Sequence, residues 1–580
     1  MEIVPEFQTR KTRYIIITVL IGVLIAAGIG GIWLNANYKR IIQQKLPAIA
    51  AKATDSLYQV TAGDVDIDLL ARKVIITDFE MLPDAEHLSR IKKDFDLPNI
   101  LLKIHIDRII MDDIAWSEVL RTQEIVCGNM TIVHPVVRVT KLADGSPDSA
   151  KQEKPSVIQA IKAARIAILN PDLSFSDGTT SSGGSYHAKG GRIDFSEWKY
   201  DLRQPKDSSR LFYAANTSIR LDTFFTKDQS AVSRIGVGGF AYNQEEGKLS
   251  ISDLTIKPTL SKEAFYRRVG HQQEIYRVHF PQLQLEGLDW KALLQRRSLV
   301  AEEGSIQDAA INIYMSRVPP PNLESKNGKF PQQLLMKLKL PVDIPLIRVA
   351  GSRFAYTELN PKSMQEGTVA MTSIHGSIRN ITNVPAKLRQ DNTCIIALQG
   401  WFKGSTVKVE FRLQINSKSG AFRIAGRSTA MDGTRLNDIT RPLALADIRS
   451  LRLDGIQFRI EGDESGARGE ITMAYQDLKT DLLEPEDEKL DKKDLTSFLA
   501  NRLLIHQNNP EPGKDLRVAH PVVPRDATKS FFNLVWKSIF TGTLQTVSRK
   551  IVKLDKVVNK KQEKREEQRK EEARKKKAGK

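Results

Sequence analysis

The sequence predicts a mainly β protein, and three observations lead to this prediction. Apolar and polar residues alternate over long stretches, as in 407–415, where five apolar residues are separated by four polar ones. A period of two is typical of a strand with one apolar and one wet face. Asp-Gly pairs, which favour tight turns, separate several of these stretches. A 36-residue segment at 104–139 recurs without a gap at 278–313, as expected of a sheet built by repetition.

The composition favours a folded chain of several domains. The chain has 580 residues and a formal net charge of +18. This length predicts roughly two to four domains. Hydrophobic residues make up 41% and charged residues 27%, so most of the chain is able to fold. The two cysteines, Cys127 and Cys394, exclude a disulfide-rich scaffold and a cysteine-based zinc site, and we interpret both as buried small apolar residues.

The N-terminal region has the pattern of a membrane anchor. After a short stub at 1–13, residues 14–34 form 21 consecutive uncharged residues, which is long enough to span the hydrocarbon core of a bilayer. Trp33 and Tyr38 are candidate residues for the membrane interface. Residues 35–56 then predict an amphipathic helix. We expect an uncleaved single-pass transmembrane helix at 14–34.

The body at 57–483 is predicted to be a sheet that contains the internal repeat. His105 and His279 are 174 residues apart, and Trp116 and Trp290 keep the same offset. Each copy predicts a strand, a helical turn that contains the Trp, and two further strands. We therefore expect a sheet built by repetition, with short helices.

The C-terminal region predicts a linker at 484–528, an amphipathic helix at 529–556 and a basic charged tail at 557–580. Aromatic residues on a basic helix suit a membrane interface, and the alternative is a helix packed over the end of the sheet. The candidates for the membrane interface on this helix are Phe531, Phe532, Trp536 and Phe540. Residues 560–580 hold eleven Lys or Arg against five Glu, so the body is only mildly basic and we expect no nucleic-acid partner.

The sequence contains none of the common catalytic or cofactor motifs. It lacks a His-Glu-x-x-His, a Gly-x-Ser-x-Gly and a Walker loop, and its nine histidines are scattered. We therefore expect no enzyme, no catalytic residue, no metal site and no cofactor.

Several stretches resemble the AsmA family of bacterial envelope proteins. They include Leu57–Asp68, which leads into Val74–Phe79, and Ser530–Phe540, within the order of anchor, short helix and long β body. The resemblance implies a repeating β-groove, which is a long, curved antiparallel sheet with an apolar inner face. It also implies a single-pass anchor in the inner membrane, with most of the chain in the periplasm. It further implies binding of phospholipids and a role in lipid transfer to the outer membrane or in its homeostasis. At the far end, the partner implied is the outer membrane or an envelope protein.

If a groove forms, its lining is expected from the alternating apolar residues, although these could instead pack on each other or on a covering helix. The candidates are Ile67, Leu69, Leu283, Leu285, Ile347, Val349, Val407, Val409, Phe411, Leu413, Ile415, Phe422 and Ile424. A second hypothesis is an envelope scaffold or assembly factor that binds protein partners and carries no lipid.

Overall fold

The computed structural model describes residues 57–84, 100–122, 124–142, 160–178, 185–201, 203, 207, 209–227, 232–483 and 505–548. Strands make up 59% and helices 13% of the structure, which confirms the prediction of a mainly β protein. The stub at 1–13, the anchor at 14–34 with Trp33, the helix at 35–56 with Tyr38, and the tail at 557–580 lie outside the described residues. No helix within the described ranges is long and apolar enough to cross a membrane.

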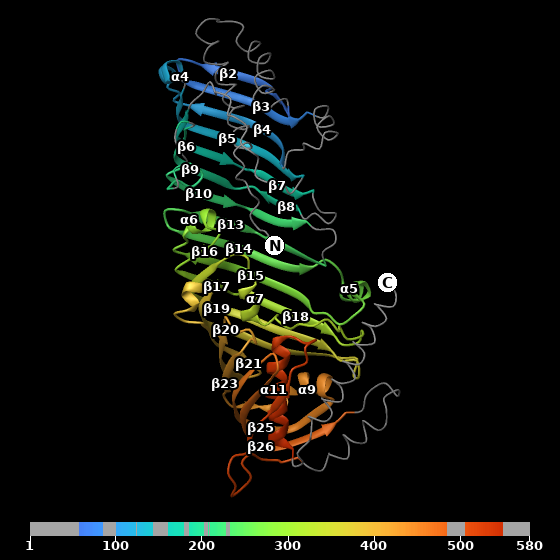
Figure 1. Cartoon of the computed structure of the whole chain (residues 1–580). Helices are drawn as coiled ribbons and strands as arrows, with labels where there is room; N and C mark the ends of the chain where they lie inside the picture. Colours follow the sequence, from blue (N-terminus) through green and yellow to red (C-terminus); the bar gives the residue numbers. More distant parts are fainter. Residues whose placement is uncertain are drawn as a thin grey trace, which may run out of the picture. The chain divides into compact units, whose positions relative to one another are not determined.

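The chain divides into two compact units, unit 1 at Met1–Thr255 and unit 2 at Ile256–Lys580. Strand β14 (Lys248–Pro258) crosses the boundary between them. The other elements of unit 1 are labelled in part in Figure 1. They are β1 (Tyr58–Thr61), β2 (Asp64–Asp68), β3 (Lys73–Pro83), β4 (Ile100–Asp112), α4 (Trp116–Thr122), β5 (Glu124–Lys141), β6 (Ala160–Leu169), β7 (Asp172–Asp177), β8 (Ser185–Lys189), β9 (Arg192–Asp201), β10 (Asn216–Leu221), β11 (Thr223–Lys227), β12 (Ser233–Val237) and β13 (Gly239–Asn243).

The elements of unit 2 include all the remaining strands and seven described helical segments. They are α5 (Lys262–Val269), β15 (Ile275–Glu286), α6 (Trp290–Gln295), β16 (Leu299–Val300), β17 (Glu303–Gln307), β18 (Ala310–Ser316), α7 (Pro331–Met336), β19 (Val342–Leu359), β20 (Glu366–Thr382), α8 (Pro385–Leu388), β21 (Thr393–Phe402), β22 (Ser405–Gln414), β23 (Phe422–Ser428), β24 (Met431–Asp432), η1 (Gly433–Leu436), α9 (Asn437–Ala444), β25 (Ala446–Asp463), β26 (Gly466–Leu482), β27 (Val518–Ala519), β28 (Val522–Pro524) and α11 (Phe531–Val547).

The strand pairing is mixed, so the prediction of an antiparallel sheet is wrong in part. In unit 1, β5 pairs in parallel with both β6 and β7, while β3, β4 and β5 pair antiparallel. In unit 2, β17 and β18 pair in parallel with β19, while β19 to β23 pair antiparallel in sequence order. A parallel pair needs a long crossover connection, and β6 and β19 each follow one. The segments 142–159 and 317–341, between β5 and β6 and between β18 and β19, provide the required length.

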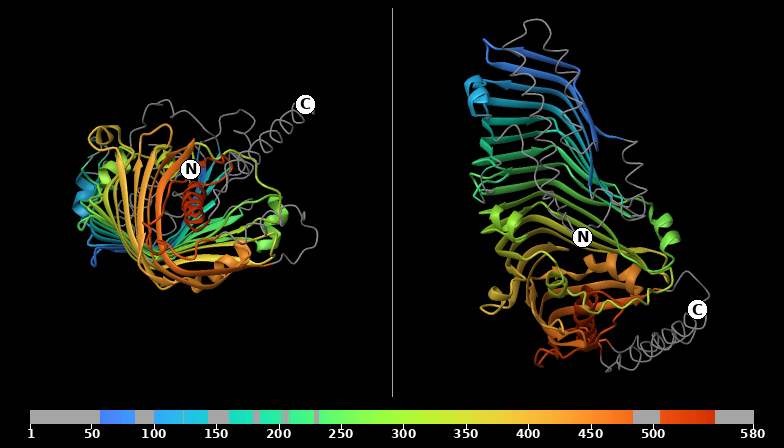
Figure 2. Two further views of the ribbon diagram at one scale, coloured as in Figure 1. Left: turned by 90° about the horizontal axis from the view of Figure 1, so that it is seen from below. Right: turned by 45° about the horizontal axis from the view of Figure 1, so that its top comes forward.

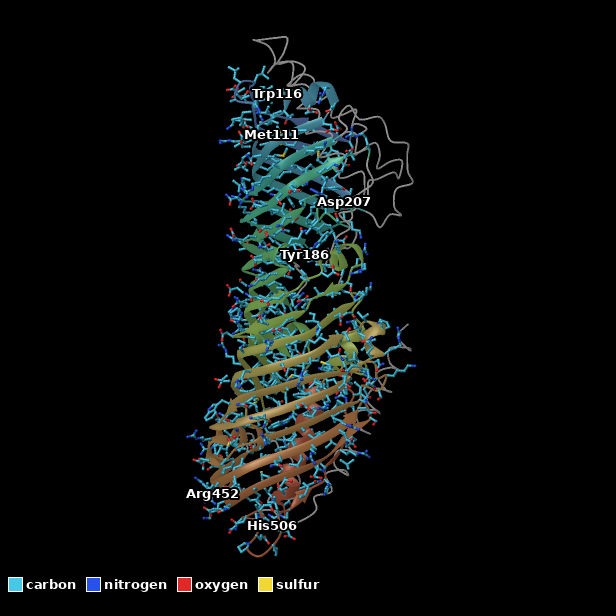
Figure 3. The ribbon with its side chains drawn as sticks, turned by 90° about the vertical axis from the view of Figure 1, so that its left-hand side faces the viewer. Met111, Trp116, Tyr186, Asp207, Arg452 and His506 are labelled. Atoms are coloured by element: carbon cyan, nitrogen blue, oxygen red, sulfur yellow. The ribbon has the colours of Figure 1, made fainter. Side chains whose placement is uncertain are left out.

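The internal repeat is confirmed, and its two copies share one strand register. The expectation of two further strands is wrong for the first copy, where β5 is continuous, and holds for the second, which has β17 and β18. His105 lies opposite Val136 on β4 and β5, and His279 lies opposite Ala310 on β15 and β18. His279 is 174 positions after His105, and Ala310 is 174 positions after Val136, so the same two repeat positions are paired in both copies. The short helices α4 and α6 begin at Trp116 and Trp290, so the Trp occupies the same structural position in both copies. Figure 3 labels Trp116, which packs against the hydrophobic cluster of unit 1, and Met111, which belongs to that cluster.

Bulges interrupt several long strand pairs. Register shifts occur between Val349 and Phe354 in the β19–β20 pair and between Thr372 and His375 in the β20–β21 pair. Ser373, inside the second shift, has a φ of 49°, which is the left-handed region that an extra bulge residue often adopts. Bulges bend a strand and increase its twist, and the strands of unit 2 bend around α11 (Figure 2).

The C-terminal part of unit 2 is ordered by hydrogen bonds to β26. β27 and β28, which lie within the range predicted as a linker, pair antiparallel with β26. Helix α11 begins after its N-cap Ser530, whose side chain accepts a hydrogen bond from Asn533 N, and it ends at Val547. The predicted helix at 529–556 is therefore confirmed for these described residues, and α11 lies on the concave side of the unit 2 strands (Figure 2).

Candidate functional site

Cross-strand pairing aligns apolar residues of unit 2 into a continuous row, which we name row A. Each member lies directly opposite the next on the neighbouring strand, and residues that are directly opposite share one face of a sheet. Row A crosses nine strands, from β15 to β26, and consists of Leu285, Gly304, Ile347, Ile378, Ile396, Phe411, Ile424, Ile460 and Gly469.

A second row, row B, lies beside row A on the same strands and the same face. On every strand, the member of row B is two residues from the member of row A, so both side chains lie on the same face. Row B consists of Leu283, Ile306, Val349, Gly376, Leu398, Val409, Gly426, Phe458 and Ile471. The two rows define what we call the apolar face of unit 2.

The apolar face contains the lining residues that the sequence predicts for unit 2. Row A holds Leu285, Ile347, Phe411 and Ile424, and row B holds Leu283, Val349 and Val409. Val407, Leu413 and Phe422 share this face because each is two residues from a row member on the same strand. Ile415 follows the end of β22 and belongs to the same hydrophobic cluster as Leu413. The structure therefore brings these eleven residues together.

Unit 1 has a row of its own. It crosses nine strands and consists of Val65, Ile76, Ile109, Ile132, Ile168, Ile193, Ile219, Tyr242 and Leu249. The predicted lining residue Ile67 lies opposite Val74, two positions from this row, and packs against the cluster of unit 1. Leu69 lies beyond the end of β2 and is 40% exposed, so the structure does not place it with the others.

Protein covers one end of the apolar face of unit 2. Leu413, Ile415, Phe422 and Ile424 are buried in a cluster with Phe531, Leu534 and Val535 of α11. The ring centroid of Phe531 lies 5.0 Å from that of Phe422 and 5.1 Å from that of Phe330, at the N-terminus of α7. At this end, the alternative in which the alternating residues pack on a covering helix is the one observed.

The other end of the face is less buried. The predicted residues Leu283, Ile347 and Val349 are intermediate in exposure. The sequence analysis missed four further row members with the same intermediate exposure, namely Ile306, Ile378, Ile396 and Leu398. A signal for Ile396 was hard to find because Ile395 precedes it, so the strand does not alternate cleanly. Membership of a row depends on the register between strands, which no single strand encodes.

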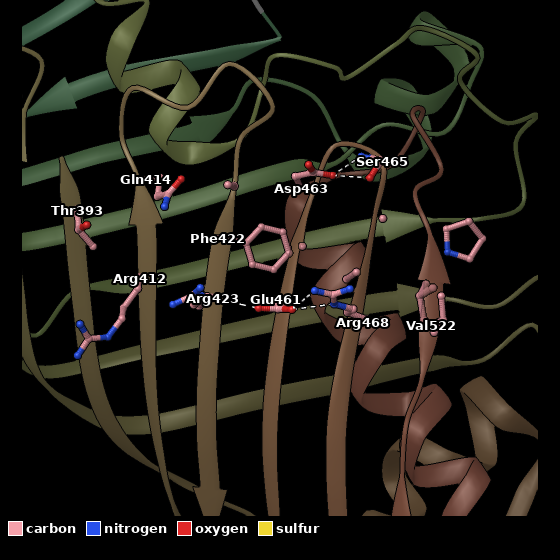
Figure 4. Close-up of a pocket in the computed structure, with 16 residues that line it drawn as sticks. Thr393, Arg412, Gln414, Phe422, Arg423, Glu461, Asp463, Ser465, Arg468 and Val522 are labelled. Carbon is pink, nitrogen blue, oxygen red and sulfur yellow. Dashed lines mark hydrogen bonds and ion pairs between the residues drawn. The ribbon is translucent and has the colours of Figure 1, made fainter.

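The opposite face of the same strands is charged. Across four adjacent strands, Arg412, Arg423, Glu461 and Arg468 lie directly opposite one another. The carboxylate of Glu461 forms ion pairs with both neighbours (Figure 4): Oε2 lies 3.7 Å from Arg423 Nε, and Oε1 lies 2.6 Å from Arg468 Nη2. These side chains line an open pocket of about 990 Å³ at the strand ends. Across these four strands, unit 2 is therefore apolar on one face and charged on the other.

The two thiols are buried as predicted. Cys127 belongs to the hydrophobic cluster of unit 1 and Cys394 to the cluster beneath α11. Burial raises the pKa of Cys127 to about 12 and that of Cys394 to about 11, so both remain protonated near neutral pH. Among the residues that the structure describes, no three His, Cys, Asp or Glu side chains are grouped so that they could hold a metal ion.

Neither the protein-family models nor the curated proteins contain a match to this chain.

Proposed function

We propose that this chain binds the acyl chains of phospholipids on the apolar face of unit 2 and supports lipid transfer to, or homeostasis of, the outer membrane. The observation that carries the proposal is the alignment of rows A and B across nine strands on a single face. A sheet of this kind offers one apolar surface to hydrocarbon, while its other face carries Arg412, Arg423 and Arg468.

The dimensions of the face suit an acyl chain. Nine strands spaced about 4.8 Å apart extend roughly 38 Å. A single acyl chain spans about half of a hydrocarbon core of about 30 Å, so one chain fits along part of a row. Each buried CH₂ group contributes about 0.8 kcal/mol, so the affinity is spread over many weak contacts. Such binding requires no specific polar pocket.

The half-buried end of the face is the favoured position for lipid. Leu283, Ile347 and Ile396 retain exposed surface that hydrocarbon could cover, and of these three only Ile396 also packs against the cluster beneath α11. Leu413 and Phe422 are already buried in that cluster. The location of the protein in this proposal comes from the sequence. The apolar segment at 14–34 and the resemblance to the AsmA family support an inner-membrane anchor with the body in the periplasm.

A second candidate function is an envelope scaffold that binds protein partners and carries no lipid. The burial of Leu413 and Ile424 by α11 favours the scaffold function, because here a protein element covers the apolar face. The two functions differ in what covers the half-buried residues of β19 to β21.

In vivo photo-crosslinking distinguishes the two functions with the full-length chain. A benzophenone amino acid would replace Ile396, and in a matched variant it would replace the neighbouring Ile395, in bacterial cells grown on radiolabelled phosphate. Ile396 belongs to row A, whereas Ile395 lies opposite Arg412 on the charged face, and both have intermediate exposure. The proposal predicts radiolabelled lipid adducts at position 396 and none at position 395. Protein adducts without lipid at position 396 would support the scaffold.

A further inference from the structure

Helix α11 has a second apolar surface that faces away from the sheet. Phe532, Trp536 and Phe540 are spaced by four residues, and they are 55%, 48% and 41% exposed. Residues four apart lie on the same side of a helix, so the three rings form one aromatic stripe. The rings of Trp536 and Phe540 are stacked with their centroids 6.3 Å apart. We name these three residues the aromatic stripe of α11.

The structure separates the stripe from Phe531, which the sequence predicts to lie at the same interface. Phe531 is only 4% exposed and packs into the cluster of the apolar face. Phe531, Leu534 and Val535 therefore fix α11 to the sheet, and the stripe projects from the other side of the helix. Large aromatic side chains that remain exposed on an anchored helix commonly mark an interaction surface.

The charge of α11 and of the sequence that follows it indicates the kind of partner. Lys537, beside Trp536, is the only ionisable residue of α11. The sequence that follows the C-cap Ser548, at 549–580, contains fifteen Lys or Arg against six Asp or Glu, a net charge of +9. The partner should therefore accept aromatic rings at its boundary and carry negative charge. A bilayer that contains anionic lipids has both properties.

We infer that α11 docks through its aromatic stripe onto the surface of an anionic lipid bilayer. Trp and Phe rings would enter the region between headgroups and acyl chains, and the net positive charge of the sequence would attract the anionic headgroups. This inference goes beyond the proposed function, because it concerns a membrane surface that the protein contacts and not the lipid that it carries. Phe531 and Phe532 then join the apolar face and the bilayer through adjacent residues of one helix.

Vesicle capture by the full-length chain tests the inference. The chain is reconstituted into neutral phosphatidylcholine nanodiscs, which accommodate the segment at 14–34, and is then mixed with fluorescent vesicles of phosphatidylcholine with phosphatidylglycerol. Flotation measures the vesicles captured. We expect the triple variant Phe532→Ser, Trp536→Ser, Phe540→Ser to bind these vesicles about 100-fold more weakly, since each partly buried ring contributes on the order of 1 kcal/mol. Trp401→Ser is the matched control, because Trp401 is 50% exposed on a strand of the sheet.

Each outcome bears on the inference. Loss of capture in the triple variant but not in Trp401→Ser supports it, provided that Cys394 stays protected from thiol reagents and thereby shows that α11 is still packed. Equal capture by the triple variant and the wild-type chain overturns it. Equal capture of neutral and anionic vesicles, without salt dependence, overturns the assignment of an anionic surface. The crosslinking at position 396 tests the proposed function separately, so vesicle capture and lipid binding can fail independently of each other.

Discussion

The ring of Phe531 on α11 packs against the ring of Phe422 on β23, with centroids 5.0 Å apart and planes inclined at 83°. This edge-to-face contact joins the C-terminal helix to the apolar face of unit 2. The apolar face is therefore half-buried at Ile396 and fully covered by α11 at Phe422. The proposed function places lipid on the half-buried part of this surface, and several predictions depend on the boundary between the two parts.

The contact predicts that two neighbouring phenylalanines differ greatly in their effect on stability. Phe531→Ala should lower the free energy of unfolding by about 3 kcal/mol or more, because it leaves a cavity among Phe330, Phe411 and Phe422. Phe532→Ala should change it by less than about 0.5 kcal/mol, because Phe532 is 55% exposed. Urea denaturation of both variants measures the difference. Similar losses in the two variants would contradict the orientation of α11.

Gly542 determines how closely α11 approaches the sheet. A Cβ atom at this position would lie 2.4 Å from Cδ1 of Ile471, so Gly542→Leu should push the helix away from β26. Overpacking typically costs about 1–3 kcal/mol, which should increase local opening by roughly 5- to 150-fold. The thiol of Cys394, in the cluster beneath α11, should then react faster with a maleimide at pH 8. Cys127, in unit 1, is an internal control whose rate should not change.

The charged face should tolerate substitutions that the apolar face does not. Arg423→Gln together with Arg468→Gln removes two ion pairs of Glu461, and partly exposed pairs of this kind contribute at most about 1 kcal/mol each. We expect the yield of lipid adducts at position 396 to stay at the wild-type level in this variant. Ile347→Asp, on row A, should reduce that yield strongly because it places a charge where hydrocarbon would lie. A loss caused by the arginine variant would place the lipid on the charged face instead.

Glu511 should make the stability of the C-terminal segment depend on pH in the acidic range. Hydrogen bonds from Lys514 and His506, at 2.6 Å and 2.5 Å, lower the pKa of Glu511 to about 2 from its ordinary value of 4.5. Because the pKa of Glu511 is lower in the folded state, its ionised carboxylate contributes fully to the free energy of unfolding above pH 4.5. This contribution is lost as the pH falls towards 2. Urea midpoints of the wild-type chain and Glu511→Gln should therefore differ at pH 6 and converge near pH 2. A constant difference across this range would exclude the mechanism.

Local patterns were sufficient to predict the strands and the repeat. Alternation in 407–415 identified β22 and its apolar side, and the 174-residue offset between Trp116 and Trp290 identified two copies whose pairing registers agree. Both signals arise within short segments, since the side-chain period of a strand follows from its backbone geometry. The helix at Phe531–Val547 was also predictable from its apolar spacing.

Other features required the tertiary structure. No local signal distinguished Ile395 from Ile396, since register across β20, β21 and β22 assigns them to opposite faces. The parallel pairing of β5 with β6 depends on where the chain returns after a long connection.

The sequence by itself determined that this chain forms a repeating β structure with alternating apolar residues and a C-terminal aromatic helix, because these properties depend on neighbouring residues. Only the tertiary structure decided that the apolar residues align in two rows, and that Phe531 packs inward while Phe532 remains exposed. Both depend on contacts between residues far apart in the chain, and the free energy of burying those surfaces arises only when the strands and α11 come together.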